Sequence, residues 1–181
     1  MVACLLSVAL SLSSACSTSL GAAGAYGVPH SAANLGVKVR SLVNLGVFDT
    51  RANLALGVES QVLQRVSDGN AWGQWRLQAL VGVTHMPKQQ ESRLGYEALL
   101  VAGAARYYVG PTAKAGSALG MTFGTPLRLS GSAPPWRADD LAALGFFVVP
   151  EVGLTTLGLG DSQEVTGGLS LRLQLWSAFM P

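Results

Sequence analysis

The stretch LSLRLQL at residues 169–175 alternates without a break between leucine and a small or polar side chain. Successive side chains of a β-strand point to opposite faces of its sheet. The stretch therefore predicts a strand with one leucine face and one face that carries Ser170, Arg172 and Gln174. A helix would spread the same leucines around its axis, so the two-residue period favours a strand.

The same period runs through most of the chain. Six further segments show it, at residues 35–48, 53–65, 74–84, 94–109, 114–124 and 146–154. Turn-forming residues at 49–51, 67–70 and 110–112 separate several of them. An eighth strand could lie within residues 18–31, where the pattern is weaker. An even number lets the first and last strands pair, so we expect a single all-β domain, an antiparallel up-and-down β-barrel of about eight strands.

Residues 125–144 interrupt the alternation and contain three prolines. Within them, PPWRADDLAAL at residues 134–144 begins with proline and carries Asp139 and Asp140 early, where a helix dipole favours acidic side chains. We therefore expect one short loop helix in this connection.

Composition excludes several classes of protein. Charged residues make up 12% of the 181 residues, against about 25% in an ordinary soluble domain. Hydrophobic residues make up 49%, which argues against disorder, yet there is no run of the about 20 apolar residues that a spanning helix needs. The net charge of +2 gives no reason to expect a nucleic-acid partner. His30 and His85 lack neighbours at metal-binding spacing, so we expect no metal or cofactor.

The N-terminus has the character of an export signal. Residues 2–12 are apolar except for Ser7 and Ser11, which is too short for a membrane span but suits the core of a signal peptide. We expect a signal peptide at residues 1–15 and a barrel domain at 16–181, with cleavage as late as Ala25 as a variant. SLSSAC at residues 11–16 also resembles a bacterial lipobox, which would make Cys16 a lipid-modified first residue. Alternatively, this segment is buried and Cys16 is a core residue.

Alternation alone does not say which face of the barrel is inside. Within the strands the charges fall mostly on the polar face, beside glycine, alanine, serine and threonine, which suits the narrow lumen of a small barrel. We expect these charges to pair inside the lumen, because an unpaired buried charge costs several kcal/mol. They are Lys38, Arg40, Glu59, Arg65, Arg76, Glu97, Lys114, Glu151 and Arg172. Arg106 departs from the rule and lies near a strand end, where it can reach the interface.

Two further features favour a barrel in a membrane. The strands reach or exceed the 9–11 residues that cross a bilayer at a tilt. Aromatic residues gather toward strand ends, where membrane barrels carry aromatic girdles. They are Trp72, Trp75, Tyr107, Tyr108, Phe123, Phe146, Trp176 and Phe179. The alternative is that these are core aromatics of a soluble sandwich.

Over residues 35–179 this pattern resembles the small eight-stranded outer-membrane β-barrels of Gram-negative bacteria. The resemblance implies residence in the cell outer membrane, contact with its lipid, and insertion by the barrel-assembly machinery. GGLSLRLQLWSAF at residues 167–179 is similar to the C-terminal strand that this machinery recognises, although Met180 and Pro181 follow Phe179.

Three functional hypotheses follow. The first is a non-catalytic, structural or accessory outer-membrane barrel whose lumen is plugged by charges. The second is a lipoprotein anchored through Cys16, with a soluble barrel that binds an apolar ligand. The third is a lipid-modifying hydrolase built on His85 with Ser117 or Ser130 and with Glu97 or Glu151, although no local motif supports it. The sequence identifies no protein partner.

Overall fold

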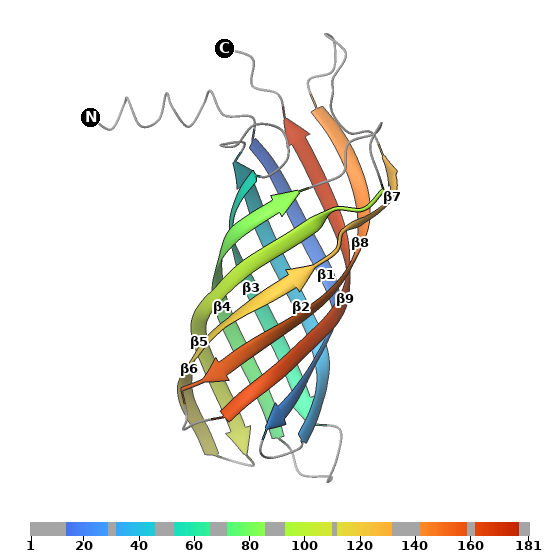
Figure 1. Ribbon diagram of the computed structural model, residues 1–181. Coiled ribbons are helices and arrows are strands. Elements are labelled where there is room, and N and C mark those ends of the chain that lie inside the picture. The colour runs from blue at the N-terminus through green and yellow to red at the C-terminus, as the bar shows by residue number, and fades with distance from the viewer. Residues whose placement is uncertain are drawn as a thin grey trace, which may run out of the picture.

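The computed structural model describes residues 14–28, 32–45, 53–65, 72–85, 93–109, 112–131, 142–158 and 162–177. They form strands that wind obliquely around a closed barrel (Figure 1). The strands are β1 (Ser14–Val28), β2 (Ala32–Leu45), β3 (Asn53–Arg65), β4 (Trp72–His85), β5 (Tyr96–Val109), β6 (Thr112–Gly124), β7 (Leu127–Gly131), β8 (Ala142–Leu157) and β9 (Ser162–Ser177).

The barrel closes by pairing its first and last strands. Neighbouring strands are antiparallel in the order β6-β5-β4-β3-β2-β1-β9-β8-β7, and β6 also pairs with β8. We call the end where Ser14 pairs with Ser177 the terminus end, and the end where Val109 pairs with Thr112 the turn end. Closure pairs the backbone of the wall all the way round, which is what a membrane-spanning sheet requires.

Strands β6 and β7 act as one strand of the wall. Their register against β8 is the same on both sides of the gap between them. In the gap, the Thr125 amide donates to the Pro150 carbonyl at 3.0 Å. Pro126 and Pro150 have no amide hydrogen, which interrupts the ladder without moving the chain out of the wall. On the other side, Leu127 forms a bridge with Leu94 ahead of β5. The wall therefore has eight strands.

Each of the eight wall strands has a glycine at a lumen-facing position. These are Gly21, Gly36, Gly57, Gly82, Gly103, Gly120, Gly153 and Gly168. A Cβ atom on Gly82 would overlap the carbonyl of Ala98 on β5. Tightly curved sheets need such positions, because the inner side of the bend leaves no room for a side chain. The glycines thus permit closure around a narrow lumen.

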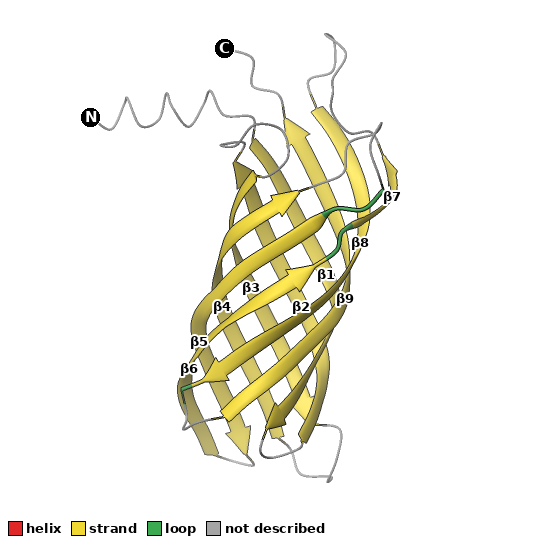
Figure 2. Ribbon diagram, viewed as in Figure 1, coloured by secondary structure: helices red, strands yellow, loops and turns green. Residues whose placement is uncertain are grey.

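Nearly all of the described residues belong to strands (Figure 2). Side chains alternate along every long strand between a buried lumen face and an exposed outer face. Leu20, Leu119 and Leu171 on the outer face are 62%, 66% and 65% exposed, whereas Arg40 and Arg172 on the lumen face are each 1% exposed. A barrel that carries apolar residues outside and charges inside is inverted relative to a water-soluble one. The orientation inferred from the sequence is thus the one the molecule has.

The predicted architecture is confirmed: an all-β, antiparallel, closed barrel of eight strands. The weakly patterned segment within residues 18–31 contributes to β1, and each of the seven clear alternating segments contributes a strand, with residues 46–48 outside the described residues. The predicted loop helix is wrong at Ala142–Leu144, which belong to β8 and pair with β9. Residues 132–141 lie outside the described residues. No helix among the described residues is long and apolar enough to cross a membrane.

Candidate functional site

Six charged side chains from five strands meet inside the lumen. Three are basic and three acidic, and each side chain is at most 6% exposed. We call them the lumen charge cluster: Lys38, Arg40, Glu59, Glu97, Glu151 and Arg172. The strands place them there because each occupies the inward position of the two-residue period. Their formal charges cancel, which is the condition under which charges are tolerated away from water.

Arg40 lies at the centre of the cluster and contacts all three carboxylates. Its Nε donates to Glu59 Oε2 at 2.6 Å, and its Nη1 donates to Glu97 Oε1 at 2.6 Å. Glu151 Oε2 lies 3.0 Å from the same Nη1. A guanidinium presents five donors in a rigid fork, so it can join β3, β5 and β8 in a way that a single ammonium could not.

Glu97 joins the two arginines of the cluster. It accepts from Arg172 Nη1 at 2.6 Å and Nη2 at 3.2 Å, in the bidentate geometry that gives strong ion pairs, and also from Arg40. Lys38 pairs with Glu151. Because every carboxylate contacts a basic group on another strand, the cluster ties opposite parts of the wall together across the lumen.

A further buried ion pair joins β4 and β9. Arg76 on β4 donates to Glu164 on β9, and Gln74 Oε1 accepts from Arg76 Nη2 at 2.9 Å. Sequence reasoning missed Glu164, because the leucine alternation of the last strand begins only at Leu169. Counting back from Arg172 in steps of two residues along β9 reaches position 164, so the same alternation would have identified Glu164.

The remaining predicted lumen charges lie apart from the lumen charge cluster. Lys114 occupies an inward position of the two-residue period in β6, which is what we call the lumen parity of a strand. Its side chain is nevertheless exposed, because it lies close to the turn end. Arg65 is half-buried as the last residue of β3. Both lie where the lumen opens to solvent, so parity placed them on the correct face without saying how deep they lie.

Neutral polar groups also fill the lumen. Ser17 Oγ, both side-chain polar atoms of Asn44 and both of Gln174 are buried without a hydrogen-bond partner in the described protein. They lie on adjacent strands β1, β2 and β9. Buried polar groups of this kind take water as their partner. Such a lining disfavours an apolar ligand, so the described lumen gives no support to a soluble barrel that binds one.

The residues considered for a hydrolase do not converge. His85 is on the outer face, where its ring stacks on Tyr96 with centroids 5.2 Å apart. Ser117 is exposed on the same outer face of the wall, whereas Glu97 and Glu151 point into the lumen. The wall thus separates the proposed base from the proposed acids. Among the described residues, no group of three or more potential ligands could hold a metal ion.

Cys16 is part of the barrel wall in this structure. It pairs with Val43 on β2 and with Leu175 on β9. Its thiol is free and its side chain is exposed on the outer face of β1. The alternative in which Cys16 is a buried core residue is therefore wrong.

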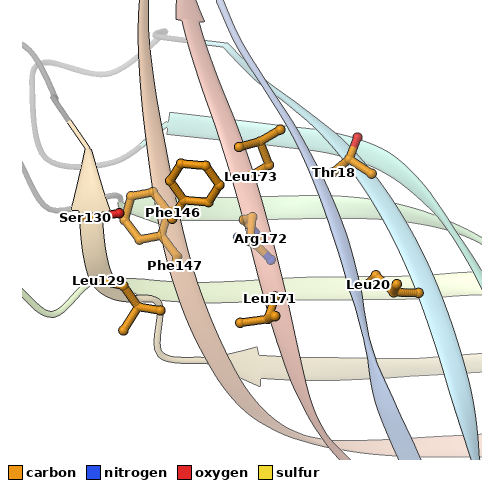
Figure 3. Close-up of a pocket in the computed structure, with 9 residues that line it drawn as sticks. All are labelled: Thr18, Leu20, Leu129, Ser130, Phe146, Phe147, Leu171, Arg172 and Leu173. Atoms are coloured by element: carbon orange, nitrogen blue, oxygen red, sulfur yellow. The ribbon is translucent and has the colours of Figure 1, made fainter.

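The outer wall carries an apolar hollow of about 630 Å³ beside β7 (Figure 3). Exposed side chains of β1, β7, β8 and β9 surround it, including Leu20, Leu129, Phe146 and Leu171. A register shift between Arg128 and Ser130 leaves Leu129 unpaired in a bulge, and bulges bend the strand that contains them. The hollow opens on the outer apolar surface, and the inward-facing Phe147 and Arg172 also contribute to its lining.

Comparison with known proteins identifies the fold. The chain is similar to Ail, the attachment invasion locus protein of Yersinia pestis, with a TM-score of 0.52 and 12% identity over 90% of this chain and 99% of that one. It is also similar to Neisserial surface protein A, with a TM-score of 0.56 and 12% identity over 89% of this chain and 95% of that one. No protein-family model matches, and no curated protein matches in sequence. At this identity the likeness shows the shared small β-barrel fold.

Proposed function

We propose that the protein is a non-catalytic outer-membrane β-barrel, structural or accessory in role, whose lumen is closed by its own charged side chains. One observation carries the proposal: the outer wall is apolar while eight paired charges lie inside. In water this arrangement would expose leucines on every long strand, a patch far larger than soluble monomers show. In a bilayer the same surface is covered by acyl chains.

Aromatic residues at both ends of the outer wall support this placement. Tyr26 and Trp75 lie toward the turn end, and Tyr96 and Phe146 lie toward the terminus end, all on the outer face and 38–48% exposed. Such positions match the two interfacial girdles of membrane barrels. Membrane lipid is therefore the first partner we propose, and the barrel-assembly machinery, acting on β9, is the second.

The lumen is filled by side chains, which supports a closed barrel and argues against a wide pore. An interior enclosed by eight strands is just wide enough for side chains to fill. Here the filling includes arginines that cross the lumen to carboxylates on other strands. We therefore expect no open aqueous channel of porin size.

A lipid on Cys16 is a second proposal, independent of the first. The lipobox-like sequence before Cys16 and the outward direction of its side chain support it, since a lipid attached there would enter the bilayer beside the wall. Metabolic labelling with a fatty acid tests it. Label that is retained by the natural chain and lost in Cys16→Ser would support the proposal, and an unlabelled natural chain would refute it.

Gel mobility of the membrane-fraction protein tests the main proposal. A closed membrane barrel stays folded in cold detergent, so the unboiled and boiled samples should migrate differently. Fractionation should place the protein in the outer membrane. A single mobility, together with protein that stays in solution without detergent, would refute the membrane barrel.

A further inference from the structure

Arg106 is the one formal charge at the outward-facing positions of the described strands. The other outward positions hold apolar, small or uncharged polar residues. Every other charge of the strands follows the lumen parity, which makes Arg106 a single exception on a surface otherwise suited to lipid. A charge at the middle of a bilayer would be costly, so the depth of Arg106 decides what it does.

Its depth follows from strand geometry. With a tilt of about 40° and a rise of about 3.4 Å per residue, the 14 residues of β5 span about 34 Å along the barrel axis. An apolar band about 25 Å tall then leaves about 5 Å of wall beyond it at each end. Arg106 precedes the last residue of β5, Val109, by a distance of about 8 Å along the axis. Its Cα thus lies just inside the band, and its long side chain reaches the headgroup layer.

The neighbours of Arg106 on the outer wall are one tryptophan and small residues. Its cross-strand partners are Trp75 on β4 and Ala115 on β6, and Ala104 lies beside it on the same face. The Trp75 indole nitrogen donates to Ser60 Oγ at 3.2 Å, which holds the ring on the outer face of the wall. A basic group beside small residues and an anchored indole is thus presented at the level of the headgroups.

We propose that Arg106 binds the phosphate of an anionic membrane lipid at the turn end of the barrel. The inference rests on the proposed membrane location. A guanidinium donates two parallel hydrogen bonds to phosphate oxygens, and such charge-assisted bonds are strong where water is scarce. Trp75 lies where it can cover the glycerol region of the same lipid, as interfacial aromatic residues do. Phospholipid and lipid A both carry the required phosphate.

Unfolding in vesicles of defined composition tests the proposal. The natural chain and Arg106→Gln are refolded into phosphatidylcholine vesicles, into vesicles that also contain phosphatidylglycerol, and into vesicles that contain lipid A. The guanidinium midpoint of unfolding is then measured in each. Lys114→Gln is the matched control, because it removes a basic side chain at the same end that follows the lumen parity.

We expect anionic lipid to raise the midpoint of the natural chain and of Lys114→Gln, and Arg106→Gln to lose most of that increase. Arg106→Lys should keep part of it, because an ammonium retains the charge but not the paired geometry. The source of the phosphate is the vesicle type that gives the larger increase. An equal increase in all variants would refute the lipid site, while folding into vesicles would still support the membrane barrel.

Discussion

Replacing Glu97 with glutamine should destabilise the barrel more than any change of one charge outside the lumen. Glu97 is 2% exposed and is held by Arg40 and by both terminal nitrogens of Arg172. Glutamine keeps the size of the side chain but removes its charge, so the lumen charge cluster changes from neutral to a net charge of +1. Removing one partner of a buried ion pair costs about 3–5 kcal/mol, because the other charge stays buried without compensation.

Guanidinium unfolding in phosphatidylcholine vesicles, followed by tryptophan fluorescence, measures this cost. Lys114→Gln is the control, and its free energy of unfolding should stay within about 0.5 kcal/mol of the natural value, since Lys114 is exposed. The double variant Glu97→Gln with Arg172→Gln makes the cluster neutral again. It should lose less stability than the two single variants together, by about 0.5–3 kcal/mol, as expected for residues in one network.

Two results would refute this reasoning. A cost for Glu97→Gln as small as that of Lys114→Gln would mean that water inside the lumen solvates these charges. Strictly additive losses in the double variant would mean that Glu97 and Arg172 do not interact across the lumen, whatever their distance in the structure.

Two further pairs of variants test the orientation and the curvature of the wall. Leu171→Arg places a charge on the outer face and should block membrane assembly at a cost of about 2–4 kcal/mol at the bilayer midplane, whereas Arg172→Leu should still assemble but unfold at a lower guanidinium midpoint. The fraction of protein that shifts on an unboiled gel checks both, and the reverse order of effects would indicate a soluble barrel. Gly82→Ala should cost about 1–3 kcal/mol, because its Cβ would overlap a backbone carbonyl, whereas Gly73→Ala on the same strand meets its nearest atom at 3.7 Å and should be near neutral. Equal unfolding midpoints for the two alanine variants would remove the steric account of the lumen glycines.

The fold could be read from the sequence because its main determinant is local. Alternation with a period of two specifies which residues share a face, and closure follows from an even number of strands. The short strand β7 was missed because Pro126 and a bulge near Leu129 disturb the alternation there. Residues 142–144 were assigned to a helix because Asp139, Asp140 and the alanines after them suit one, yet pairing with β9 outweighs that propensity.

The sequence predicted which face of the barrel wall the charged side chains occupy, but not how deep in the lumen they lie. Parity identifies which charges enter the lumen, yet it says nothing about their height along the axis. Lys114 and Arg40 both occupy inward positions, but Lys114 is close to the start of β6 at the rim, whereas Arg40 lies in the interior of β2 at the centre of the lumen charge cluster. The partner of Arg76 could not be identified either, because Glu164 lies 88 residues away in sequence.

The lumen charges explain the specificity of pairing better than they explain stability. Buried ion pairs offset their own desolvation only in part, so apolar residues of similar size could fill the same space. A slip of β2 by one residue, however, would turn both Lys38 and Arg40 outward, at a cost of about 2–4 kcal/mol for each charge at the bilayer midplane. The apolar outer face alone discriminates less, since a leucine turned into the lumen is tolerated at Leu42. A chain with Lys38→Leu and Arg40→Leu, with Glu59→Gln and Glu151→Gln added so that no carboxylate loses its partner, should therefore fold into a mixture of registers, visible as multiple amide signals by NMR. A single set of signals from that chain would show that backbone pairing and the lumen glycines specify the register without the charges.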